Sequence, residues 1–219
     1  MKAALASSFF TNALVVLAVG AWALILSANG WVIPTSFFAP LSTVVTVLSV
    51  ALLVFDKWGW SWWGLRLIAR HPDLRGTWKG TLESSWMDPA TKALKGPIAW
   101  FLIVKQTYTG LHLRLMTSES TSASLATTLV EEADGTWSVN GIYRNEPELL
   151  LQARSRIHHG GLVLRVGGPP PDRLSGQYWT DRLTHGTMAL DRVSRARADD
   201  LATAEKLAGK TSSVGATRT

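Results

Sequence analysis

A long uncharged stretch near the N-terminus limits the folds open to this chain more than any other sequence feature. No charged residue occurs between Lys2 and Asp56, and two apolar runs extend from about residue 9 to 28 and from about 37 to 55. A helix needs roughly 20 apolar residues to cross a hydrocarbon layer about 30 Å thick. Residues 1–56 therefore predict two transmembrane helices.

The distribution of basic residues predicts how this hairpin lies in the membrane. Turn-forming Asn, Gly and Pro residues separate the two runs, and their connection contains no Lys or Arg. Basic residues follow the second run at Lys57, Arg66, Arg70 and Arg75. Because positive residues stay on the cytoplasmic side, we expect a multi-pass protein of the inner membrane with both termini in the cytoplasm.

The first run also permits a second interpretation. Lys2 followed by an apolar run and Ala21-Trp22-Ala23 would suit a cleaved signal peptide. Even after such cleavage, the second run would remain in the membrane. The charges that follow it would still hold the rest of the chain in the cytoplasm.

Two features around the second run suggest contacts with lipid and with other helices. Ala39, Ser42, Thr46 and Ser49 recur at three- and four-residue steps, so small side chains share one helix face. Such a face suits contact between protomers, or packing of the two helices within one chain. Residues 57–72 are rich in Trp beside basic residues, which is typical of the headgroup layer. The alternative is that these tryptophans belong to the soluble core.

Residues 73–193 have the pattern of a β-sheet domain. Apolar and polar residues alternate there, as in Leu111–Met116, and Gly, Pro and Asp separate the segments. We expect about eight antiparallel strands that close into a ligand-binding barrel. The strands are predicted near residues 76–84, 98–107, 111–116, 122–131, 136–143, 149–157, 161–166, and a final pair at 176–179 and 186–193, which could form one hairpin. The fold class is thus a membrane-anchored all-β protein.

A short signature occurs three times in this domain: Gly76-Thr77-Trp78, Gly135-Thr136-Trp137 and Gly176-Gln177-Tyr178. It is similar to signatures that open strands in fatty-acid-binding, lipocalin and avidin barrels. A simpler interpretation is that each Gly begins a strand and each aromatic ring plugs an end of the barrel.

One predicted strand requires a cover on its outer face. Ile98–Val104 is apolar at both parities, whereas a solvated barrel strand needs only one apolar face. The candidates are another subunit, the Trp-rich segment, or the Ala-rich stretch Ala198–Ala208. We expect the Ala-rich tail, residues 194–219, to be disordered, above all from Lys210 onward, where Ser, Thr and Gly are frequent.

The composition points to binding and not to catalysis. The chain has no Cys and carries a net charge of +6, which suits an anionic partner such as a phosphate ligand, acidic lipid or nucleic acid. No phosphate loop, nucleophile elbow or metal-binding motif occurs. His158 and His159 are adjacent, and neighbours in a strand point to opposite faces, so they suit a hairpin better than a metal site. We expect no enzyme activity, no catalytic residue, no metal and no cofactor.

Several short motifs together resemble a known family. They are His71–Gly80, Gln106-Thr107-Tyr108, Tyr143-Arg144-Asn145, His159-Gly160 and Gly176–Arg182 with Gly186, all after two uncharged helices. The set is similar to the two-transmembrane, β-strand-rich effectors of bacterial CBASS anti-phage systems, the CD-NTase-associated protein fifteen family.

This resemblance implies a function and a ligand set. The family's barrel binds a cyclic dinucleotide made by a partner synthase; the protomers then form a homo-oligomer, and the helices disrupt the lipid of the inner membrane. No DNA or RNA polymer is implied. Carried onto this sequence, the ligand-binding candidates are Gln106, Tyr108, Tyr143, Arg144, His159, Tyr178, Thr180 and Arg182. Arg suits phosphate, and aromatic rings suit bases.

Two other classes of function remain open from the sequence. The first is a membrane-tethered barrel that binds a lipid or another apolar ligand, which the repeated Gly-x-aromatic signature permits. The second is a structural membrane scaffold or an enzyme without a recognised motif.

Overall fold

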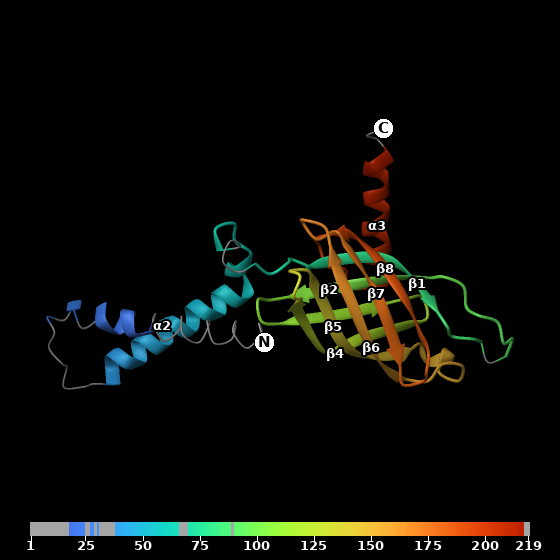
Figure 1. The fold of residues 1–219 in the computed structure, drawn as a ribbon, viewed down its shortest axis with the longest axis horizontal. Helices are drawn as coiled ribbons and strands as arrows, with labels where there is room; N and C mark the ends of the chain where they lie inside the picture. The colour runs from blue at the N-terminus through green and yellow to red at the C-terminus, as the bar shows by residue number, and fades with distance from the viewer. Residues whose placement is uncertain are drawn as a thin grey trace. The chain divides into compact units, whose positions relative to one another are not determined.

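The structure is a computed structural model that describes residues 18–24, 27, 28, 30, 38–65, 70–88 and 90–216 of the 219-residue chain. It divides into two compact units, residues 1–70 and 71–219. Figure 1 shows helix α2 in the first unit and the strands with helix α3 in the second. Each unit is described by itself.

The N-terminal unit contains helix α2 (Phe38–Lys57), followed by the 3₁₀ helix η1 (Gly59–Ser61). Residues 18–24, 27 and 28 are helical, and the remainder of the first predicted membrane helix lies outside the described residues. Of the small-residue face, Thr46 and Ser49 lie on α2, while the side chains of Ala39 and Ser42 are outside the described residues. Within the part of the chain that is described, no helix reaches the length and apolarity that crossing a membrane demands.

The tryptophans after α2 differ in their exposure. Trp60 is fully buried, whereas Trp58 and Trp62 are each 57% exposed and Trp63 is 90% exposed. Residues 66–69 of this predicted interfacial segment lie outside the described residues. The exposed Trp rings near Lys57 offer an aromatic surface that can contact lipid headgroups or another protein.

The second unit is a closed barrel of eight antiparallel strands, in which each strand pairs with the next and β8 returns to β1. This confirms the predicted barrel. The strands are β1 (Gly76–Ser84), β2 (Ile98–Gln106), β3 (Leu111–Met116), β4 (Ser120–Glu131), β5 (Trp137–Pro147), β6 (His158–Gly167), β7 (Arg173–Thr180) and β8 (His185–Ser194). We call the end where β1 begins the base, and the end where β1 finishes the mouth.

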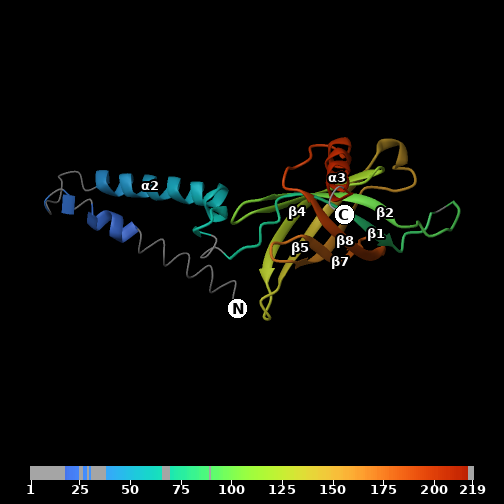
Figure 2. The same cartoon turned by 90° about the horizontal axis from the view of Figure 1, so that it is seen from above.

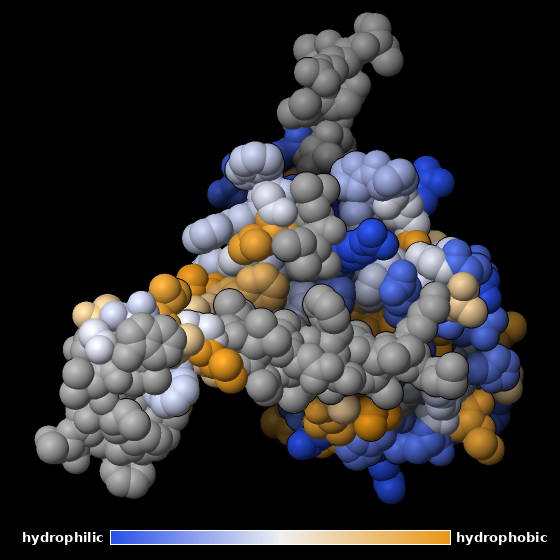
Figure 3. Space-filling model, turned by 60° about the vertical axis from the view of Figure 1, so that its left-hand side comes forward, coloured by the Kyte–Doolittle hydropathy of each residue, from blue (hydrophilic) through white to orange (hydrophobic). Residues whose placement is uncertain are grey.

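Alternation along the strands separates the inside of the barrel from its surface. Inward side chains such as Trp78, Trp100, Leu102, Leu162 and Leu164 are at most 2% exposed and form one core. Polar side chains cover most of the barrel surface that is visible in Figure 3. The apolar core thus fills the interior of the barrel.

The first Gly-x-aromatic signature closes the base. Gly76 begins β1 with φ +127°, and a Cβ there would lie 2.1 Å from the Ser194 carbonyl oxygen, so only Gly fits. Trp78 is buried and donates its indole N–H to the Leu74 carbonyl at 2.9 Å. The interpretation of a Gly that begins a strand and a ring that plugs the barrel is confirmed for this copy.

One predicted strand is wrong. Residues 149–157 form the 3₁₀ helix η3 (Leu149–Leu151) and turns that connect β5 to β6. Leu149 and Leu150 are 79% and 94% exposed, and Leu151 donates its backbone N–H to the Glu148 carbonyl at 2.8 Å. Three consecutive leucines have no period-two alternation, so this run has no single face to bury in a sheet.

The C-terminal tail forms a helix where we expected disorder. Helix α3 (Leu201–Ala216) begins after Asp200, whose carboxylate accepts the Thr203 backbone N–H at 2.7 Å, as an N-cap does. Figure 2 views this helix where it meets the barrel. Helix formation is therefore supported by a cap and by packing on the barrel surface.

Helix α3 also identifies the cover of the doubly apolar strand. Phe101 and Ile103 on the outer face of β2 pack with Ala198, Ala204 and Ala208. Alanine side chains let the helix approach closely, and Phe101 and Ile103 are only 4% and 7% exposed. Of the three candidates, the Ala-rich stretch is the one that covers this face. The face is thus filled within one chain and is not an open surface for assembly.

Candidate ligand-binding cavity

A cavity of about 380 Å³ opens at the mouth of the barrel. All eight strands and the four connections at this end contribute to its wall. Its floor is apolar, with Leu82, Trp100, Leu115 and Met188, while serines, threonines, Asn145 and three basic residues lie around the wall. A volume of this size holds a small organic ligand.

Two tyrosines from neighbouring parts of the sheet face this cavity. Tyr143 of β5 is 6% exposed and Tyr178 of β7 is 7% exposed. The Tyr178 hydroxyl donates to Ser84 Oγ at 2.6 Å, which fixes its ring. Burial raises the pKa of both phenols, so both rings are neutral at physiological pH. They offer flat apolar faces with polar tips.

Gly160 explains how the Tyr143 ring fits. Gly160 pairs with Tyr143 on β5 and with Thr180 on β7. A Cβ at Gly160 would lie 2.5 Å from both Cζ and the hydroxyl oxygen of Tyr143. The missing side chain thus creates the space that the Tyr143 ring occupies.

Arg182 brings a positive charge into the cavity without forming an ion pair with any described residue. Its guanidinium donates to Ser155 Oγ at 3.1 Å and lies 3.3 Å from His158 Nε2. Among the described residues, no ion pair includes Arg182, and its buried Nε meets no hydrogen-bond acceptor. Burial lowers the pKa of this guanidinium, and the charge of the neighbouring Asp181 offsets only part of that effect.

A second charged group lies in the connections around the mouth. Glu119 accepts Lys95 Nζ at 2.5 Å and Arg154 Nη2 at 3.0 Å, both on its Oε2 atom. Asp88 lies 3.6 Å from Arg154 Nη1. Lys95 and Arg154 each lie 5.8 Å from the centre of the Trp86 ring, within cation–π range. The mouth thus combines an aromatic ring with two cations.

The structure brings four of the eight predicted ligand residues together in this cavity: Tyr143, Tyr178, Thr180 and Arg182. Two others, Arg144 and His159, lie on the outer face of the barrel. Arg144 Nε pairs with Glu146 Oε1 at 3.1 Å, and His159 Nδ1 lies 3.6 Å from Asp181 Oδ2. Each is next in sequence to an inward residue, so strand alternation turns it outward.

The remaining two, Gln106 and Tyr108, lie at the base. Gln106 donates to the Pro72 carbonyl at 3.0 Å and accepts the Leu74 backbone N–H at 2.8 Å, and Tyr108 stacks on His71 with ring centres 4.5 Å apart. These contacts hold residues 71–74 against the barrel. Gln106 therefore satisfies backbone groups of the segment that enters β1.

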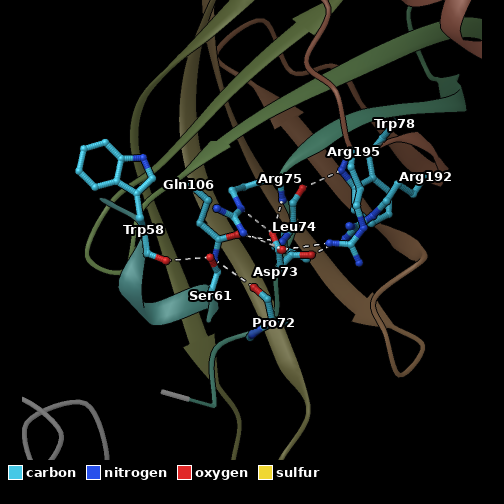
Figure 4. A network of polar contacts seen from close by, with 10 residues as sticks. All are labelled: Trp58, Ser61, Pro72, Asp73, Leu74, Arg75, Trp78, Gln106, Arg192 and Arg195. Atoms are coloured by element: carbon cyan, nitrogen blue, oxygen red, sulfur yellow. Dashed lines mark hydrogen bonds and ion pairs between the residues drawn. The ribbon is translucent and has the colours of Figure 1, made fainter. Parts of the chain in front are cut away.

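Asp73 strengthens the same attachment at the base. Figure 4 shows its carboxylate between Arg75 and Arg195, at 2.9 and 3.2 Å. Burial alone would raise the pKa of Asp73, but hydrogen bonds and charge from Arg75 lower it below its ordinary value. The side chain is 4% exposed, so these contacts compensate an otherwise unfavourable buried charge.

Sequence reasoning missed several cavity residues. Asn145 and His158 share the inward parity of Tyr143, and this parity is the signal that could have found them. Lys95, Glu119 and Arg154 lie in connections, where no periodic pattern marks the direction of a side chain.

The chain matches a family model described as Cap15, cyclic dinucleotide receptor domain, over residues 69–192. The chain belongs to this Cap15 family. The matched region contains every residue of the cavity wall. A similar curated protein, CD-NTase-associated protein 15 of Staphylococcus schleiferi, is 24% identical over 164 residues, which cover 75% of this chain and 81% of that protein. The resemblance inferred from the short motifs is confirmed.

Proposed function

We propose that this chain is a CBASS effector whose barrel binds a cyclic dinucleotide in the cavity at the mouth. The observation that carries the proposal is Arg182, a guanidinium in the cavity wall without a carboxylate partner among the described residues, beside two buried tyrosines. A cyclic dinucleotide supplies two phosphodiester anions and two flat bases. Arg182 suits a phosphate, and Tyr143 and Tyr178 suit stacking or edge contact with a base.

The polar wall favours this ligand over a lipid. An apolar ligand would cover the floor formed by Leu82, Trp100, Leu115 and Met188, but it would also bury Arg182 and the amide group of Asn145 without partners on the ligand. Burying such polar groups without compensation is unfavourable. Ser122 and Asn145 already bond to each other at 2.7 Å, which leaves the Asn145 amide group for a ligand acceptor.

A titration of the full-length protein tests the proposal. Calorimetry with cyclic di-AMP, cyclic di-GMP and cyclic GMP–AMP should give saturable binding of at least one of them, and palmitate should give none. Binding of palmitate alone would instead favour the membrane-tethered lipid carrier. Binding of neither class would contradict the cavity as the ligand site.

We also propose that residues 9–28 and 37–55 cross the inner membrane and that ligand binding leads to a homo-oligomer that disrupts it. The support is the absence of charge from residue 3 to residue 55, the basic residues that follow, and the exposed Trp58, Trp62 and Trp63. The face of Ala39, Ser42, Thr46 and Ser49 is the candidate contact between helices. In this proposal the barrel binds the ligand, and the helices disrupt the membrane.

Reporter fusions and dye entry test this second step. A reporter after Thr219 should be active only in the cytoplasm, and activity in the periplasm would contradict the topology. Cells that make both this protein and a cyclic dinucleotide synthase should take up propidium iodide, whereas cells carrying Arg182→Ala should exclude it. Equal uptake with both versions would separate membrane damage from the proposed cavity.

A further inference from the structure

The only acidic side chain in the cavity wall is Glu119, among the residues that the structure describes. It lies in the short β3–β4 connection, where its backbone N–H donates to Thr117 Oγ1 and its carbonyl accepts the Glu148 N–H at 2.9 Å. The backbone position of Glu119 is thus fixed by two neighbouring connections. Its carboxylate faces the same space that the proposed ligand would enter.

Glu119 already neutralises two of the three basic residues in the wall. Lys95 and Arg154 both contact its Oε2 atom, at 2.5 and 3.0 Å, while Arg182 has no such partner. Hydrogen bonding from Lys95, with further help from Arg154, lowers the pKa of Glu119, so the carboxylate is ionised at neutral pH. The free cavity therefore holds one cation without an ion-pair partner, Arg182, and two cations that are paired with an internal anion.

We propose that Glu119 is an internal counter-ion that a ligand phosphate displaces from Lys95 and Arg154. The inference rests on the proposed function and adds an exchange of counter-ions to it. One phosphate can meet Arg182 without competition, whereas a second anionic group must replace the Glu119 carboxylate. The second anionic contact therefore carries a cost that the contact with Arg182 does not.

Displacement would also change how the connections at the mouth are joined. In the free protein, Lys95 belongs to the β1–β2 connection, Glu119 to the β3–β4 connection and Arg154 to the β5–β6 connection, and the single carboxylate links all three. The cation–π contacts with Trp86 keep both cations near the mouth when the carboxylate leaves. When the ligand enters, its phosphate therefore takes the place of the Glu119 carboxylate between Lys95 and Arg154.

The test compares the affinity of full-length variants for the cyclic dinucleotide that the wild type binds best in the panel above. Glu119→Gln keeps the size of the side chain and removes its charge, so it should bind about threefold or more tightly at low salt. The gain should shrink as salt rises, because the side chains of Lys95, Glu119 and Arg154 are 30–40% exposed and their charges are screened. The matched control is Glu146→Gln, which breaks the ion pair with Arg144 outside the cavity and should leave affinity unchanged.

The outcomes separate this inference from the proposed function. If the wild type binds no member of the panel, the proposed function fails. If the wild type binds and Glu119→Gln binds equally or more weakly, Glu119 positions the cations and the counter-ion inference is overturned.

A second variant keeps the inference testable if Glu119→Gln does not fold. Glu119→Ser also removes the carboxylate, and it introduces the side chain that the neighbouring Ser118 and Ser120 already carry in this connection. It should also bind more tightly than the wild type. Equal or weaker binding by this folded variant would overturn the inference.

Discussion

Arg182 Nη2 lies 3.3 Å from His158 Nε2 inside the cavity. His158 Nδ1 lies 3.0 Å from the Arg156 carbonyl oxygen, which can only accept, so the proton of the neutral imidazole is on Nδ1. Nε2 then accepts from Arg182. Burial and the charge of Arg182 lower the pKa of His158, which keeps the ring neutral at pH 7 and leaves Arg182 as the positive group.

Replacing Arg182 should weaken ligand binding strongly. Arg182→Ala removes the guanidinium that we assign to phosphate, and we expect a loss of about 1.5–3 kcal/mol in a calorimetric titration. Arg144→Ala is the matched control, because Arg144 lies on the outer face beside Glu146 and should bind as the wild type does. Equal affinity of both variants and the wild type would remove Arg182 from the binding site.

Adding one methyl group at Gly160 should also weaken binding. A Cβ there would lie 2.5 Å from the Tyr143 ring and 2.6 Å from the Trp179 carbonyl oxygen, so the ring must move. We expect Gly160→Ala to lose about 1–2 kcal/mol of binding free energy through disturbed base contacts. Gly167→Ala serves as the control, since its Cβ would approach Arg173 Cβ no closer than 3.5 Å. The hypothesis fails if the two variants have the same affinity.

Stability should fall in mildly acidic solution because two histidines are held neutral. Burial lowers the pKa of His71 and of His158 below their ordinary value of 6.5. The unfolded chain therefore binds more protons than the folded protein as the pH drops below about 6.5. The free energy of unfolding should decrease from there and level off below the folded pKa values.

His71→Phe should make this pH dependence shallower. Phe keeps a ring against Tyr108 and removes both the titrating group and the buried Nδ1, which has no hydrogen-bond partner in the described residues. Denaturant melts at pH 7.5 and pH 5.5 measure the change. An identical pH dependence in the wild type and the variant would exclude His71 as a contributor.

Charge under helix α3 should destabilise the barrel. Ala204 is fully buried in the cluster with Phe101 and Ile103, so Ala204→Glu places a carboxylate against apolar side chains. We expect a loss of about 2–4 kcal/mol in the free energy of unfolding. Ala202→Glu, on the exposed side of the same helix, should change it by less than about 0.5 kcal/mol. Equal melting temperatures would mean that α3 does not protect this face in solution.

Much of the barrel could be predicted from local patterns. Leu111–Met116 alternates strictly, and it became strand β3 with the predicted bounds. Residues 149–157 were also predicted as a strand, but Leu149 and Leu150 are exposed in a connection. The Ala-rich tail looked disordered because its helix is stabilised by a tertiary contact with Phe101 and Ile103, which no local pattern shows.

The same reasoning predicted only half of the candidate ligand-binding residues correctly as lining the cavity. Tyr143 and Arg144 are adjacent and both suit a ligand, yet only Tyr143 points into the cavity. Gln106 points inward as well, but the direction of β2 places it at the base. The chemical type of each residue therefore identified suitable ligand-binding candidates, but it did not show which of them face the cavity.

The sequence by itself determined the division into an uncharged N-terminal segment and an alternating β domain, because charge and period depend on neighbouring residues alone. It also carried the short motifs of the family. The tertiary structure decided which parity of each strand faces inward and which end of the barrel each residue reaches. Those properties depend on register and closure between strands far apart in sequence. Only closure brings Arg182, Tyr143 and Glu119 to one mouth.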